Sequence, residues 1–259
     1  MANDGRDDRA ADAPAAGAPF WAGELPLFYK APHLLNSERH KRAGIKPGGD
    51  FAFARDANAV PLGADEIFAA QFDFPVVFAE TKPSLPVAVL GVGRKRNAFV
   101  DSAGKWRAGT YIPAYIRRYP FILATGLAPG QVHVAIDEGA ACFDPEGGQG
   151  LFEQGGLSRF TRQAIEFCQA FQTQFDLARS FSETLEAAGL LVPKRVDIQL
   201  PDGTRMSLDR FRIIDEARFD AVPDATFLTW RRRGWLGLVY AHFLSMRRWQ
   251  AFAVPPSTE

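Results

Sequence analysis

The sequence has little cysteine and no excess charge of either sign. Its two cysteines, Cys142 and Cys168, form no CxxC pair and have no histidine at a zinc-ligand spacing. The pattern therefore predicts neither a disulfide framework nor a zinc site, and it favours a reducing compartment. The 30 Lys and Arg residues balance 30 Asp and Glu residues, so no net field draws the chain toward nucleic acid.

Long apolar runs are also missing. The longest, residues 234–246, is well short of the roughly 20 residues that cross a bilayer, so we expect no transmembrane segment. Residues 1–19 lack large side chains that could offset ordering entropy, and they lack the apolar core of a secretory signal. We therefore expect a disordered tail over residues 1–19 and a cytoplasmic location.

Phenylalanine is plentiful, with 22 residues, and can fill a core without help from disulfides or metal. Residues 20–137 contain short apolar segments, rich in β-branched and aromatic residues, that Gly, Pro, Lys or Asp separate. This pattern predicts a sheet-rich region with mainly antiparallel strands and one short helix at 64–71. The expected strands are 74–80, 86–92, 97–101, 120–126 and 131–137.

The pattern changes in the second half. Residues 138–157 carry six Gly and one Pro, which predicts a loop or linker. From residue 158 apolar side chains recur every three or four positions, which predicts a long amphipathic helix, or a broken pair, with Ser158 as N-cap and Gly189 at its end.

The remaining residues predict a hairpin at 196–214 and two helices, at 225–233 and 235–248. The fold class that follows is α+β, with a mainly antiparallel sheet in the N-terminal half. A helical region at 158–259 containing one β-hairpin packs on that sheet as one domain.

Motifs for catalysis are absent. The four histidines are not arranged as HExxH or as a facial triad, GxSxG does not occur, and GVGRKRN at 91–97 lacks the third glycine of GxGxxG. His133 and Asp137 lie about 13 Å apart along a strand, too far for joint ligation. We therefore assign no catalytic residue, no metal ligand and no cofactor. His133 and His242 are expected to be hydrogen-bonded core or interface residues.

The densest cluster of polar aromatic and basic residues is WRAGTYIPAYIRRYPF at 106–121. Such residues can stack on a ring, hold a carboxylate or phosphate through paired Arg, or anchor a protein partner. They can equally pack across the sheet and pair with acids of the helical half. We call these residues the Tyr/Arg patch: Trp106, Tyr111, Tyr115, Arg117, Arg118 and Tyr119. With His33 and His242, the patch is our candidate site for an unknown protein or a small anionic ligand.

A second basic cluster covers residues 229–249, with five Arg and no acid. It is compatible with binding to an anionic membrane or an acidic partner. Alternatively, its apolar face closes the core and its arginines pair with the acidic segment 215–224.

Several segments resemble the bacterial SapC family, collinearly from about residue 20 to the C-terminus. They are PLFYKAPHLLNSERHKRAGIKP (26–47), the run from VPLGADEIFAAQFDFPVVF through NAFVDSAGKW, YIPAYIRRYPFIL (111–123) and RRRGWLGLVYAHFLSM. The family takes its name from a protein associated with a bacterial paracrystalline surface layer, and the resemblance brings no catalytic residues with it.

The resemblance therefore implies a non-enzymatic accessory or binding component in surface-layer or envelope function. Two alternatives stay open. One is an enzyme that modifies a peptide or small molecule through His33, His40 or His242 with the Tyr/Arg patch. The other is a protein that docks on a membrane surface through residues 229–249.

Overall fold

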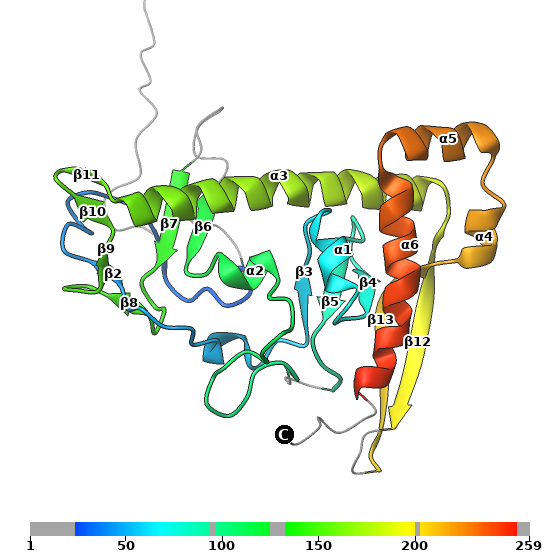
Figure 1. Cartoon of the computed structure of the whole chain (residues 1–259), viewed down its shortest axis with the longest axis horizontal. Helices are drawn as coiled ribbons and strands as arrows, with labels where there is room; N and C mark the ends of the chain where they lie inside the picture. Colours follow the sequence, from blue (N-terminus) through cyan, green and yellow to red (C-terminus); the bar gives the residue numbers. More distant parts are fainter. Residues whose placement is uncertain (1–23, 94–96, 125–132, 200–202, 253–259) are drawn as a thin grey trace, which may run out of the picture.

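A computed structural model describes residues 24–93, 97–124, 133–199 and 203–252. One long helix, α3 (Arg159–Ala187), runs along the molecule, and β-strands lie beneath each half of it (Figure 1). The predicted α+β class is confirmed, with antiparallel sheets and separate helices. The expected tail at residues 1–19 lies outside the described residues.

The sheet beneath the first half of α3 has three antiparallel strands in the order β1-β7-β6. Two smaller sheets beside it consist of two-residue strands, in the orders β8-β2-β9 and β10-β11. The strands are β1 (Pro32–Leu34), β2 (Gly44–Ile45), β6 (Phe121–Ala124), β7 (His133–Asp137), β8 (Phe143–Asp144), β9 (Gln149–Gly150), β10 (Phe152–Glu153) and β11 (Gly156–Leu157).

The sheet beneath the second half of α3 has five antiparallel strands in the order β12-β13-β4-β5-β3. Its strands are β3 (Ala59–Pro61), β4 (Val76–Ala79), β5 (Pro86–Val89), β12 (Leu191–Gln199) and β13 (Arg205–Ile214). The predicted hairpin is therefore present. It joins the sheet of the N-terminal half because Phe211 and Arg212 of β13 pair with Ala79 and Phe78 of β4.

Helix α3 begins where the sequence predicts, because the Ser158 side chain accepts a hydrogen bond from the Thr161 N–H. Its first half packs Cys168 on a small core with Phe121 and Ile136 of the three-stranded sheet. Its second half contributes to a much larger core around the five-stranded sheet. One helix thus contributes to both cores.

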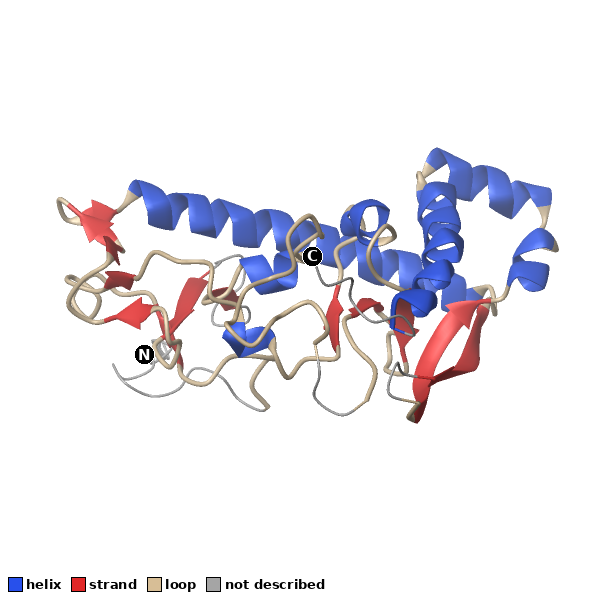
Figure 2. Cartoon of the chain, turned by 60° about the horizontal axis from the view of Figure 1, so that its bottom comes forward, coloured by secondary structure: helices blue, strands red, loops and turns tan. Residues whose placement is uncertain are grey.

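The other helices are short and gather mostly at one end of the molecule (Figure 2). They are α1 (Glu66–Ala70), α2 (Ala114–Arg117), α4 (Glu216–Asp220), α5 (Asp224–Arg232) and α6 (Trp235–Ser245), with 3-10 turns η1 (Ala52–Ala54) and η2 (Met246–Phe252). No helix in the described part of the chain is both long enough and apolar enough to cross a membrane.

Three local expectations differ from the structure. Residues 97–101 do not form a strand, because the Asn97 side chain accepts a hydrogen bond from the Phe99 N–H and turns the chain. In this segment only Val100 makes a β-bridge, to Trp106. Residues 138–157 contain β8 to β11 rather than loop alone. Helix α4 was not expected, and it forms because Asp215 caps it by accepting the Arg218 N–H.

Candidate functional site

The Tyr/Arg patch surrounds α2, which has only four residues. Pro113 precedes the helix with an extended backbone, and Pro120 follows it closely, so a proline limits the helix at each end. Consecutive side chains of an α-helix point in different directions, so Arg117 and Arg118 diverge although they are neighbours in the chain. The patch therefore divides among three environments instead of forming one surface.

Tyr111 and Arg117 belong to the first environment, next to a buried carboxylate. Glu66 accepts hydrogen bonds from the Tyr111 hydroxyl at 2.9 Å and from the Ala114 N–H at 2.5 Å, and it also accepts the Gly63 N–H. Arg117 then donates to the Tyr111 hydroxyl at 3.1 Å. Burial raises the pKa of Glu66, and the three donors oppose that rise. Glu66 thus fixes the start of α2 and orients Tyr111.

Tyr115 and Arg118 are buried and form the second environment. The Arg118 guanidinium carbon lies 4.2 Å from the Tyr115 ring centre and 4.7 Å from that of Phe171, with Tyr29 also near. No carboxylate pairs with Arg118 among the residues described. Cation–π contacts of roughly 2 kcal/mol each when desolvated offset part of the cost of burying this charge.

Tyr119 belongs to the third environment, where a second buried carboxylate holds it. Its hydroxyl donates to Asp137 at 2.9 Å, and its ring stacks on Phe53 with centroids 4.3 Å apart. Asp137 also accepts the backbone N–H groups of Lys30 and Ala31. Trp106 is next to this region, because its ring packs on Phe51 with ring centroids 5.8 Å apart. Asp137 therefore positions Tyr119 and the Lys30 backbone together.

A cleft of about 870 Å³ opens between the first half of α3, the end of α2 and the segment 45–53. Its apolar lining is mostly aromatic, and its polar lining is mostly basic. The main apolar residues are Ile45, Phe51, Phe53, Phe121, Phe160 and Phe167, and the charged ones are Lys30, Lys46, Arg117, Arg118 and Asp50. The cleft therefore carries four cations and one carboxylate.

None of these four cations makes an ion pair within the described ranges. Asp50 is partly engaged, because it accepts the Ala52 N–H at 2.8 Å. Arg117 is exposed and reaches Glu66 only through Tyr111. Cys142 also lines the cleft, but burial raises the pKa of its thiol, so it is a poor nucleophile at neutral pH.

A smaller cavity of about 380 Å³ lies on the other side of Arg117 and Phe167, which line both spaces. Glu66 and Tyr111 line this smaller cavity. Arg117 is therefore the residue of the Tyr/Arg patch that is exposed and faces both cavities.

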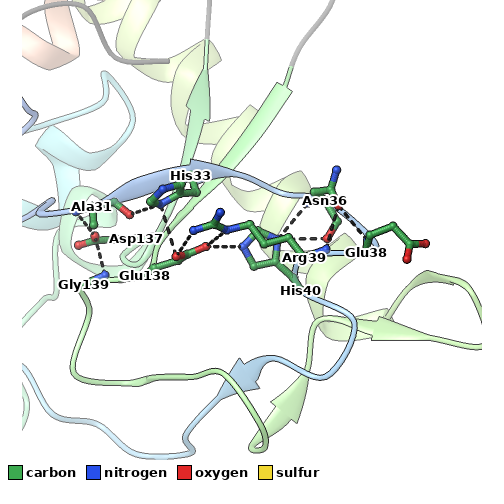
Figure 3. A network of polar contacts seen from close by, with 9 residues as sticks. All are labelled: Ala31, His33, Asn36, Glu38, Arg39, His40, Asp137, Glu138 and Gly139. Carbon is green, nitrogen blue, oxygen red and sulfur yellow. Dashed lines mark hydrogen bonds and ion pairs between the residues drawn. The ribbon is translucent and has the colours of Figure 1, made fainter. Parts of the chain in front are cut away.

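His33 and His40 lie outside both cavities and meet at one carboxylate. Glu138 accepts from Arg39 at 2.5 Å and contacts His40 at 3.0 Å, with His33 at 3.6 Å on its other side (Figure 3). The hydrogen bond from Arg39 lowers the pKa of Glu138, while burial lowers the pKa of His40. This network joins the turn after β1 to the end of β7, so these side chains stabilise the fold.

His242 is far from this network and is completely enclosed. Its Nδ1 contacts the Val76 carbonyl at 2.8 Å, and its Nε2 accepts the Ile214 N–H at 3.1 Å. Burial lowers the pKa of His242 to about 4, so the ring is neutral and uses both nitrogens. The histidines therefore do not converge with Tyr111 and Arg117, and His33 and His242 do not join the cleft.

Several residues that shape the site do not belong to the predicted Tyr/Arg patch. Glu66 begins the otherwise apolar helix α1, and Asp137 follows the buried apolar residues 134–136 of β7. An acid next to such residues is a signal for a buried hydrogen-bonded anchor. Lys30 and Lys46 gave no signal, because only the folded chain brings them to the cleft. In the part of the chain that the structure covers, no three His, Cys, Asp or Glu side chains are arranged so that they could hold a metal ion.

The fold is α+β, and its largest described cleft has a charged lining that is mostly basic and an apolar lining rich in aromatic residues. The sequence model of the SapC family matches residues 35–252, which is most of the chain, and the chain therefore belongs to the SapC family. No curated protein and no solved structure matches the chain.

Proposed function

We propose that this SapC-family protein is a non-enzymatic binding component that serves bacterial envelope or surface-layer function. Its site is the cleft beneath the first half of α3, and its ligand is a small molecule with one anionic group on an apolar, ring-containing body. The observation that carries this proposal is the excess of four cations over one carboxylate around an aromatic lining.

Size and charge both support such a ligand. A volume of about 870 Å³ is in the range of roughly 300–1,000 Å³ that is typical of small-molecule pockets. A cation at the mouth of an apolar cleft attracts a carboxylate or phosphate, and an aromatic wall accepts the uncharged part of the same molecule.

The residues of the Tyr/Arg patch have different roles in this proposal. Arg117 and Lys46 are exposed and contact the anionic group. Tyr115 and Arg118 hold α2 against α3, and Tyr119 with Phe53 forms part of the wall. This division is supported by burial, because Tyr115 and Arg118 are buried and the Arg118 guanidinium packs on the Tyr115 and Phe171 rings.

A matched pair of fluorescent probes tests the proposal. 1-Pyrenebutyrate has an anionic end on a large apolar ring system, and 1-pyrenebutanol has the same body without the charge. We expect the wild-type protein to bind pyrenebutyrate more tightly than pyrenebutanol. The double variant Arg117→Gln/Lys46→Gln should weaken pyrenebutyrate binding by roughly tenfold or more, since each lost charged contact is worth about 1.5–3 kcal/mol.

Lys194→Gln is the matched control, because Lys194 is an exposed cation on β12 and does not line the cleft. Circular dichroism confirms that both variants are folded. Equal affinity for the two probes, or an unchanged affinity in the double variant, would show that the cleft does not select an anion.

A further inference from the structure

Helix α6, with the sequence WLGLVYAHFLS, carries no charge, because its single titratable histidine, His242, is neutral. The helix is nevertheless not fully enclosed by the rest of the protein. Trp235, Leu238 and Val239 are buried against the larger core. On the opposite side Tyr240 is 50% exposed and Leu244 is 58% exposed. A helix that is apolar on all sides is normally covered on all sides. The exposed face of α6 is therefore a candidate contact surface for another molecule.

Helix α1 extends this open face. Phe68 is 45% exposed, and Phe72, just after the helix, is 65% exposed. The Phe68 ring lies directly on α6 at Gly237, where an added Cβ would come within 3.0 Å of its Cε1 and Cζ atoms. Tyr240 and Leu244 follow Gly237 at helical spacings of three and seven, so they share its side of the helix. We call Phe68, Phe72, Tyr240 and Leu244 the α1–α6 face.

The charged residues in the segment that follows α6 are all basic. Arg247 and Arg248 are exposed and follow directly on from α6, and residues 225–252 contain no acid. The arginines of this segment do not pair with the acids of segment 215–224 in the described structure; the side chain of Asp215, for example, caps α4. Arg247 and Arg248 are therefore available to an outside partner.

We propose that the α1–α6 face docks on the surface of an anionic lipid bilayer. Aromatic and leucyl side chains enter the boundary between headgroups and acyl chains, and the arginines contact lipid phosphates. A second copy of the chain fits less well, because a two-fold contact through this face would bring two sets of unpaired arginines together. The proposal goes beyond ligand binding and does not depend on the cleft.

Vesicle co-sedimentation tests this proposal. We expect the full chain to sediment with vesicles of phosphatidylcholine and phosphatidylglycerol, to sediment poorly with phosphatidylcholine alone, and to be released by high salt. The variant Tyr240→Ser/Leu244→Ser should weaken binding to the anionic vesicles by roughly tenfold or more, because each side chain loses its burial in the bilayer. The variant Arg247→Gln/Arg248→Gln should weaken binding and also reduce its salt dependence.

Two controls make the result specific. Leu27→Ser removes a leucine that is 44% exposed but lies before β1, where its carbonyl accepts from Tyr115. Arg117→Gln/Lys46→Gln removes cations of the cleft. Both controls should bind vesicles like the wild type, which separates this proposal from the one for the cleft.

The proposal is overturned if the wild type does not sediment with anionic vesicles, or if Tyr240→Ser/Leu244→Ser sediments with them unchanged. A further overturning result is a dimer, detected by analytical ultracentrifugation, that these substitutions dissociate while vesicles bind neither protein. In that case the α1–α6 face is a contact between copies of the chain.

Discussion

Asp137 is a single buried carboxylate that holds three separate segments together. One oxygen accepts from the Ala31 and Gly139 N–H groups, and the other accepts from Lys30 and the Tyr119 hydroxyl. All four partners are donors, so an ionised acid satisfies them and an amide does not. Asp137 thereby connects the chain before β1 to the wall of the cleft.

Replacing Asp137 with Asn should destabilise the protein by about 2–4 kcal/mol. The amide keeps one acceptor oxygen but turns an NH₂ group toward N–H and O–H donors that are then left unpaired. Urea unfolding measures the loss. Asp176→Asn, on the exposed side of α3, should change the free energy of unfolding by less than about 0.5 kcal/mol. Equal stability of the two variants would contradict this role for Asp137.

His242 gives the stability a defined pH dependence. Its pKa in the folded protein is lowered to about 4, so the unfolded chain binds a proton more readily. The free energy of unfolding should therefore fall as the pH is lowered from about 6.5 to 4, with His242 contributing up to about 3 kcal/mol of that loss. Urea unfolding at several pH values should show a flatter pH dependence in His242→Gln, although this variant is less stable at neutral pH. Parallel pH profiles would refute the assignment.

At the residue scale the sequence predicts where polar aromatic and basic residues cluster, but not which of them are exposed and which are buried. The Tyr/Arg patch was recognisable from the spacing of its side chains, and its division into exposed and buried residues was not. Arg117 and Arg118 are neighbours in the chain, yet one is exposed and the other lies among three rings. Their directions depend on the length of α2 and on what α3 places above it, which are tertiary effects.

At the scale of elements, α3 was the most predictable feature, because a regular spacing of apolar residues and a capping serine need no tertiary information. The short strands were less predictable. Two-residue strands such as β2 and β8 carry no periodicity, and they form only because the fold places their backbones side by side.

The cap of α3 can be tested by Ser158→Ala. Ser158 is buried, and it accepts the Thr161 N–H at 3.1 Å and donates to the Thr161 hydroxyl. Loss of these bonds should lower the free energy of unfolding by about 1–2 kcal/mol. Ser180→Ala, at an exposed position of the same helix, should have little effect or stabilise slightly. If both variants unfold at the wild-type urea concentration, the cap does not stabilise the helix.

At the scale of the whole molecule, α3 brings together residues that are far apart in the sequence. Lys30, Lys46 and Arg117 reach one cleft because the three-stranded sheet and the segment 45–53 pack beneath the same half of this helix. The fold class followed from the order of strand and helix patterns. The cleft could not be predicted in this way, because its excess of positive charge arises only when three distant segments come together in the folded chain.

Photolabelling measures directly whether the cleft is an anion-selective binding site. The full chain is irradiated with 4-benzoylbenzoate, an aromatic carboxylate that crosslinks where it binds, and the adducts are mapped by mass spectrometry. We predict adducts within residues 45–53, 116–121 and 160–167, which excess pyrenebutyrate suppresses and pyrenebutanol does not. Adducts scattered over the surface, or adducts in the cleft that both competitors suppress equally, would contradict the account.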